Sequence, residues 1–176
     1  MLTASIIIVV IALAVGIVLA IAASKPDSFR IQRATNIKSP PEKIFPHLED
    51  LHAHSAWSPF EKDPNMKRTH SGAPKGKGAV YEWHGNRQVG SGRIAITDTV
   101  PNSKVMLKLD MFRPFTAHNV VEFSLVPNGS GTNVSWAMQG QQPFMAKLVG
   151  TFINCDKMVG TQFEEGLAKL KAIAER

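Results

Sequence analysis

The 176-residue sequence contains only one cysteine, Cys155. A single thiol cannot form an internal disulfide, so the chain is not held together by covalent cross-links, and its redox compartment stays open. Cys155 lies on an apolar stripe near the C-terminus, where we expect a small buried core residue.

The motifs of common catalytic and metal-binding sites are also missing. The sequence has no His-Glu-x-x-His, no paired cysteines and no Gly-x-Ser-x-Gly. The spacing of His47, His52 and His54 fits no standard metal site. The glycine-rich loop over residues 72–78 lacks the Gly-Lys-Ser/Thr ending of a phosphate loop. We therefore expect no metal and no cofactor.

Charge is absent from residues 2–23, and the first charged side chain is Lys25. This apolar run is long enough to cross a bilayer core as a helix. The alternative is a cleaved signal peptide, since Ala20-Ile21-Ala22 matches an A-x-A cleavage site, although no basic residue precedes the run. We predict a transmembrane anchor over residues 1–24, a linker over 25–28 and one domain over 29–176.

The formal net charge of +6 lies entirely after this apolar run. Four basic residues, Lys25, Arg30, Arg33 and Lys38, follow it closely, so the positive-inside rule predicts a cytoplasmic domain and an external N-terminus. Signal cleavage would instead give a secreted or periplasmic protein. The basic residues are scattered rather than interleaved with aromatic residues, so we expect the membrane and not a nucleic acid as partner.

Between the linker and the C-terminal region, apolar residues recur with period two. Seven strands are predicted over residues 29–37, 66–71, 78–84, 88–99, 104–112, 117–127 and 132–139. A short helix is expected after residue 39, and a second brief turn over residues 52–57. Short connections between the later strands predict antiparallel neighbours, and the whole pattern predicts an α+β domain.

The last thirty or so residues carry an apolar stripe with steps of three and four, which predicts helix. We expect a short helix from Phe144 to about Phe152, a break near Gly150, and a long helix to the C-terminus. Gly160 and Gly166 suggest close approach of another backbone. Because so wide an apolar face needs a partner, this helix is predicted to cover a sheet that curves around it.

Four stretches together resemble the START-like helix-grip superfamily, in its polyketide cyclase/dehydrase branch, also called SRPBCC. They are Ser39–Phe45 with Trp57–Phe60, Tyr81–Asn86, Gly90–Gly92 and Gly131–Trp136. The resemblance covers about residues 29–175. It implies a curved antiparallel sheet gripping the C-terminal helix around a cavity for lipids, sterols, polyketides or other hydrophobic molecules. It implies no fixed catalytic residues.

The alternation of side chains along each strand places one apolar set on the inner face of the sheet, and the apolar stripe of the C-terminal region adds three residues to it. The predicted ligand-binding residues are Tyr81, Trp83, Leu107, Met111, Asn119, Phe123, Trp136, Met138, Met145, Phe152 and Val159. Pockets for apolar ligands have this composition, with a few polar groups. The alternative is that the same side chains simply fill the core.

Three functions remain open at this point. The first is a membrane-anchored domain that binds or carries a hydrophobic small molecule. The second is a cyclase or dehydratase acting on such a molecule, with Tyr81 as the candidate acid and Asn119 as a donor to an oxygen. The third is a protein-interaction module at the membrane.

Overall fold

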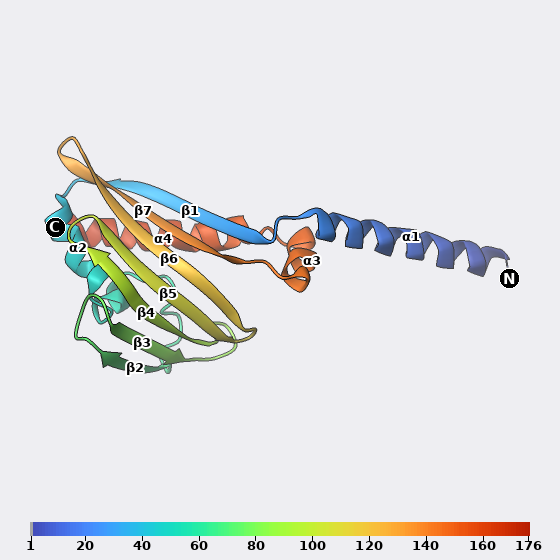
Figure 1. The fold of residues 1–176 in the computed structure, drawn as a ribbon, viewed down its shortest axis with the longest axis horizontal. Helices are drawn as coiled ribbons and strands as arrows, with labels where there is room; N and C mark the ends of the chain where they lie inside the picture. Colours follow the sequence, from blue (N-terminus) through green and yellow to red (C-terminus); the bar gives the residue numbers. More distant parts are fainter. Residues whose placement is uncertain (1) are drawn as a thin grey trace.

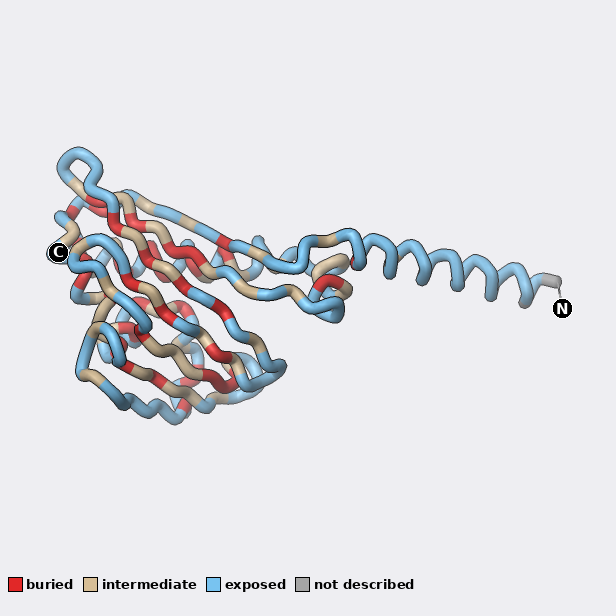
Figure 2. Tube along the Cα trace, viewed as in Figure 1, coloured by how far each residue is buried: buried red, intermediate tan, exposed pale blue. Residues whose placement is uncertain are grey.

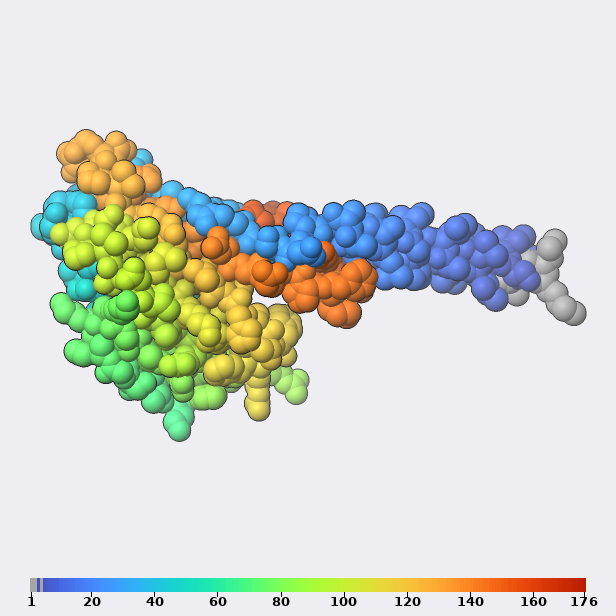
Figure 3. Space-filling model, in the orientation of Figure 1, coloured from blue at the N-terminus to red at the C-terminus, as the bar shows by residue number. Residues whose placement is uncertain are grey.

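The structure is a computed structural model that describes residues 2–176. A long helix, α1 (Leu2–Ser24), projects from one end of an α+β domain formed by the rest of the chain (Figure 1). The side chains of α1 are exposed along nearly its whole length, and only its last turns touch the domain (Figure 3). The helix predicted from the uncharged run is therefore present. The described residues contain one helix long and apolar enough to cross a membrane, Ser5–Ser24.

The domain is built on one seven-stranded antiparallel sheet, in the order β1-β7-β6-β5-β4-β3-β2. The strands are β1 (Ser28–Ile37), β2 (Lys67–Gly72), β3 (Ala79–His84), β4 (Ser91–Val100), β5 (Lys104–Arg113), β6 (Ala117–Asn128) and β7 (Gly131–Gln141). Consecutive strands from β2 to β7 are neighbours, and β1 joins the edge beside β7. This confirms the predicted fold class, a curved antiparallel sheet around a long C-terminal helix.

The strand β4 begins three residues later than the period-two pattern indicates, at Ser91 rather than residue 88. The residues before it form a tight turn, in which the Gly85 amide donates to the Gly90 carbonyl and the Gly90 amide to the Asn86 carbonyl. Gly90 has φ +66°, a conformation that glycine adopts without steric cost. The alternation of residues 88–90 thus belongs to a turn and not to the sheet.

Two short helical segments close the end of the domain opposite α1: α2 (Pro41–Glu49) and the 3-10 helix η1 (Ala53–Ala56) (Figure 1). The apolar face of α2, with Ile44, Phe45 and Leu48, is buried. Proline in its first turn is compatible with a helix start, because the missing amide would have no helical partner there.

The C-terminal region forms two helices, α3 (Phe144–Phe152) and α4 (Cys155–Ala174), as predicted. The Asn154 side chain caps α4 by accepting a hydrogen bond of 2.9 Å from the Lys157 amide. Helix α4 packs against β1 and β7 and buries Phe163, Leu167 and Leu170. Cys155 starts α4 and is only partly buried, so the prediction of a buried core cysteine is wrong.

Gly160 and Gly166 do permit close approach, but of side chains rather than of another backbone. A Cβ at Gly160 would collide with the Arg33 guanidinium, and one at Gly166 would collide with the Trp136 ring. Arg33 reaches from β1 to α4, where it pairs with Asp156 at 2.9 Å and Glu164 at 2.8 Å. These contacts hold α4 against the β1 edge of the sheet.

Candidate functional site

The strand register arranges the inner-face side chains in rows that run across the sheet. One row contains Tyr81, Ile94, Leu109 and Asn119, and the next contains Trp83, Gly92, Met111 and Ala117. A third row, farther from α1, joins Ile96, Leu107, Val121 and Met138. The concave face is therefore apolar and aromatic, with few polar groups.

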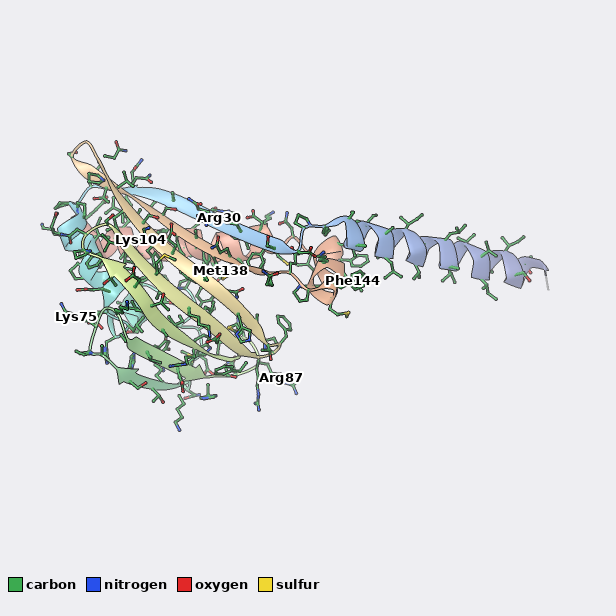
Figure 4. All side chains as sticks on the ribbon, in the orientation of Figure 1. Arg30, Lys75, Arg87, Lys104, Met138 and Phe144 are labelled. Carbon is green, nitrogen blue, oxygen red and sulfur yellow. The ribbon has the colours of Figure 1, made fainter. Side chains whose placement is uncertain are left out.

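Burial divides the predicted ligand-binding residues into two groups. Leu107, Phe123 and Trp136 are buried in the core beneath α4. Four others are inward-facing but only partly buried: Trp83, Met111, Met138 and Val159. Leu109, which the prediction did not include, also faces inward and is partly buried. The buried positions appear red along the strands in Figure 2, and tan positions mark partial burial. Met138 is labelled on β7 in Figure 4.

Burial falls along the strands: the row of Leu107 and Val121 is largely buried, and the rows nearer the end of the sheet that α2 and η1 do not close are less covered. Trp83, Leu109 and Met111 occupy that less covered part, toward the end of the sheet that carries the β3–β4 loop. Arg87, labelled in Figure 4, marks this loop on the side of the domain that faces α1. An apolar floor of this kind suits a hydrophobic ligand.

Two members of the predicted set do not lie over the sheet. Met145 and Phe152 are on α3 and are 66% and 73% exposed. The prediction of one continuous apolar stripe over the sheet is wrong here, because the chain turns between Phe152 and Cys155 and redirects the helix axis.

Trp136 is at the centre of an aromatic cluster under α4. Its ring stacks on Phe163 with centroids 4.2 Å apart, and it meets Trp57 and Phe123 at 5.5 Å and 5.0 Å. The indole N–H of Trp136 is buried and has no hydrogen-bond partner among the described residues. An unpaired buried donor costs about 1–3 kcal/mol, so this N–H lowers the stability of the core.

Tyr81 is held in a polar contact that sequence reasoning did not foresee. Its hydroxyl donates to Glu61 at 2.7 Å, and Arg68 pairs with the same carboxylate at 2.7 Å. Burial, and then the hydrogen bond to Glu61, raise the pKa of Tyr81 well above its ordinary value. Glu61 lies in an irregular loop, where no periodic pattern predicts which face a side chain takes. The raised pKa makes Tyr81 a weaker acid and its proton is already donated to Glu61, which favours a structural or positioning role over acid catalysis.

Asn119 is buried, and its side chain lies across Gly140 of the neighbouring strand. It shares a row with Tyr81, but β4 and β5 lie between them. Three strand spacings place the two backbones about 14 Å apart. The two candidate catalytic groups are therefore poorly placed to act together on one carbonyl.

The histidines take separate structural roles. His54 is buried against Trp57, and burial lowers its pKa to about 4. His52 stacks on His70 with centroids 4.0 Å apart, and His118 pairs with Asp110 at 2.6 Å on the outer face. Within residues 2–176, no three His, Cys, Asp or Glu side chains converge as metal ligands would.

Two hollows are lined by residues other than Trp83, Leu109 and Met111. One of about 130 Å³ is lined by residues around Leu51, His52, His70 and Val80. The other, an open groove of about 560 Å³, is lined by Phe152, Ile153, Asn154, Lys157, Met158, Thr161 and Gln162. The groove runs from the end of α3 onto the first turns of α4, on the part of the domain next to α1.

A family model described as "Polyketide cyclase / dehydrase and lipid transport" matches residues 28–175. No curated protein matches the sequence significantly.

Solved structures share the fold at low sequence identity. A protein from Mesorhizobium loti superposes with TM-score 0.62 at 18% identity, over 84% of this chain and 98% of its own. The Aha1 dimer from Colwellia psychrerythraea superposes with TM-score 0.56 at 19% identity, over 84% and 96%. The di-domain ARO/CYC StfQ from the steffimycin biosynthetic pathway gives TM-score 0.63 at 11% identity, over 84% and 51%.

Proposed function

This chain belongs to the polyketide cyclase/dehydrase and lipid transport family of the START-like helix-grip superfamily, and from that premise we propose that it binds a hydrophobic small molecule. The ligand lies on the concave face of the sheet, beside α4. Helix α1 anchors the domain to a membrane.

The observation that carries this proposal is the incomplete covering of the concave face. Trp83, Leu109 and Met111 face inward and yet remain only partly buried, whereas Leu107 and Val121 in the adjoining row are buried. Burying apolar surface contributes about 25 cal/mol per Å². A hydrophobic ligand on this floor gains that contribution without displacing the core beneath α4.

A polar group on the ligand adds specificity. The buried amide of Asn119, in the same row as Leu109, is a polar group that the inner face offers beside the apolar floor. A carbonyl or hydroxyl oxygen on the ligand would accept a hydrogen bond from this amide. The preferred ligand is therefore a largely apolar molecule with an oxygen acceptor.

The test is native mass spectrometry of the full chain released from mild detergent micelles. We expect an added mass, distinct from the detergent, that organic solvent removes. Leu109→Trp fills the partly covered floor and is expected to abolish the adduct. Val126→Trp is the matched control, because Val126 is exposed on β6, and it is expected to retain the adduct.

A bare mass for the unmodified chain contradicts ligand binding, provided that lipids and polyketide-like probes also fail to shift it. An adduct that survives in Leu109→Trp places the ligand elsewhere. Circular dichroism of both variants establishes that the sheet is intact, since overpacking costs about 1–3 kcal/mol.

The anchor requires its own measurement. The mass of the intact chain distinguishes an uncleaved anchor from a signal peptide, because cleavage after the A-x-A pattern ending at Ala22 would remove α1. We expect the full mass, and resistance to extraction at alkaline pH. A chain that lacks its first residues, or that alkaline extraction releases from the membrane, contradicts the anchor. Neither outcome bears on ligand binding, which the adduct tests separately. The side of the membrane on which the domain lies is then tested with a Val126→Cys thiol and a thiol reagent that cannot cross membranes. We expect the thiol to stay unlabelled in intact cells, because the domain is cytoplasmic.

Binding without chemistry is favoured over catalysis by the arrangement of Tyr81 and Glu61. If Tyr81 were a catalytic acid, Tyr81→Phe would abolish turnover while ligand binding survived. We expect instead that Tyr81→Phe alters stability and leaves the adduct in place. A stoichiometric protein partner combined with a ligand-free core would favour the interaction-module alternative.

A further inference from the structure

Helix α3 has the reverse of the burial pattern of a helix in a water-soluble domain. Its one fully buried residue is Lys147, at 7% exposure, whereas Phe144, Met145, Val149 and Phe152 are between 45% and 73% exposed. On a helical projection these four residues fall on one side, and Lys147 falls on the other. A helix that exposes its apolar side needs an apolar environment to cover it.

The position of α3 identifies what that environment is. Helix α3 packs against the end of α1 and lies crosswise to it (Figure 1). Ala22, in the last turns of α1, is completely buried where the two helices meet. If α1 crosses a bilayer, a crosswise helix at its end lies close to the plane of the membrane surface. Phe144, labelled in Figure 4, is on α3 at this junction.

Polar contacts fix α3 to the segment that leaves α1. Lys147 pairs with Asp27 at 2.6 Å, and the Lys25 ammonium donates to the Gly150 carbonyl at 2.6 Å. The Gln142 amide donates to the Asp27 carbonyl at 2.7 Å. These bonds occupy the polar side of α3, so its apolar side is directed away from the linker.

The apolar surface continues beyond α3. Ile153 and Met158 are exposed and line the open groove of about 560 Å³, together with Lys157. An apolar surface with a basic residue at its rim matches the boundary between acyl chains and anionic headgroups. A lipid surface is thus the occupant that both the apolar side chains and the charge favour.

We propose that α3 and the first turn of α4 form an interfacial membrane-docking surface. Phe144, Met145, Val149, Phe152, Ile153 and Met158 insert among the lipids at the surface of the bilayer that α1 spans. Docking holds the domain in one orientation, with the partly covered floor directed toward the membrane. The inference rests on the proposed anchor, and not on the proposed ligand.

The test uses the full chain, with Cys155→Ser, reconstituted in vesicles of equal parts phosphatidylcholine and phosphatidylglycerol. A nitroxide is attached to a single engineered cysteine, and its collisions with oxygen and with a water-soluble nickel chelate are compared. Phe152→Cys and Val149→Cys probe α3. Val126→Cys is the matched control for Val149→Cys, because both replace exposed valines and Val126 is near the hairpin opposite α1 (Figure 1).

We expect oxygen collisions to dominate at positions 149 and 152, and nickel collisions to dominate at position 126. Nickel access at 149 and 152 equal to that at 126 overturns the inference, even if alkaline extraction shows that α1 remains inserted. Spin–spin broadening at position 152 means that a second copy covers the surface, which also overturns it. Release of the chain by alkaline extraction removes the anchor and the docking surface together, while the mass-spectrometric adduct still reports on ligand binding.

Discussion

In α4, the side chains of Phe163, Leu167 and Leu170 are buried against the sheet. In α3, Met145 and Phe152 are exposed and a lysine is buried. Both helices carry apolar residues at steps of three and four, so their patterns alone predict the same behaviour. The two helices differ in what lies beside them. An apolar stripe therefore predicts a buried helix face, but not whether protein or lipid buries it.

The largest expected difference in stability between the two helices comes from replacing one phenylalanine in each with alanine. Phe163→Ala removes a buried ring stacked on Trp136 and is expected to destabilise the domain by about 3–5 kcal/mol. Phe152→Ala, at an exposed site, is expected to change stability by about 0.5 kcal/mol or less in detergent. Urea unfolding of the full chain measures both, and equal losses would contradict the comparison.

Acid is expected to weaken the core before it affects α3. Burial lowers the pKa of His54 to about 4, from an ordinary value of 6.5. Between these values the unfolded state binds more protons than the folded state, so stability falls as the pH falls. The loss is about 3 kcal/mol at 1.36 kcal/mol per pKa unit. It is absent above pH 6.5 and complete below about pH 4.

Unfolding free energies measured across this pH range test the expectation. The His54→Leu variant is the control, because it cannot take up the proton and should lack this part of the pH dependence. An unchanged pH dependence in the variant would assign the acid sensitivity to other groups.

Replacing one glycine in each helix with alanine is expected to change stability by a smaller amount, with opposite signs in the two helices. A Cβ at Gly166 would approach Trp136 to 2.7 Å and Pro59 to 2.9 Å, so Gly166→Ala is expected to destabilise by about 1–3 kcal/mol. At Gly150 the nearest atoms would be 3.6 Å or more away. Gly150→Ala should therefore stabilise by about 0.5–1 kcal/mol, through helix propensity. Thermal unfolding of the two variants measures the signs, and the same sign for both would contradict this assignment.

The smallest effect concerns the contact between α3 and the linker. The hydrogen bond from Lys147, and then its charge, lower the pKa of Asp27 below its ordinary 3.8. This contact contributes fully above pH 3.8 and is lost as the pH falls through the lowered value. Hydrogen exchange should show α3 amides becoming less protected in that window, and Asp27→Asn should remove the dependence. An unchanged dependence in Asp27→Asn would exclude this pair as its cause.

Much of the fold followed from short-range patterns. The alternation of Val105 and Leu107 with Lys108, and of Val121 and Phe123 with Glu122, identified both the strands and their inner face. The one clear displacement of a strand start, at β4, came from a turn whose residues happen to alternate. Strand pattern succeeds because period two is a property of each strand by itself.

The candidate site was less predictable. Parity placed Tyr81 and Trp83 correctly on the inner face, but not the hydrogen bond to Glu61, because that residue comes from an irregular loop. It also could not distinguish buried Leu107 from partly buried Leu109, since both face inward on β5. That distinction depends on position along β5, because Leu107 is nearer the end of the sheet that α2 and η1 close.

The amino-acid pattern alone encodes the long uncharged helix, the antiparallel strands with their inner faces, and the division of the C-terminal region into two helices. Each of these follows from local composition and periodicity. The folded structure was needed to place α4 over β1 and β7, to fill the space left by Gly160 and Gly166 with Arg33 and Trp136, and to turn the apolar side of α3 outward beside α1. These features depend on contacts between segments far apart in the chain, such as Lys147 with Asp27, which no local pattern encodes.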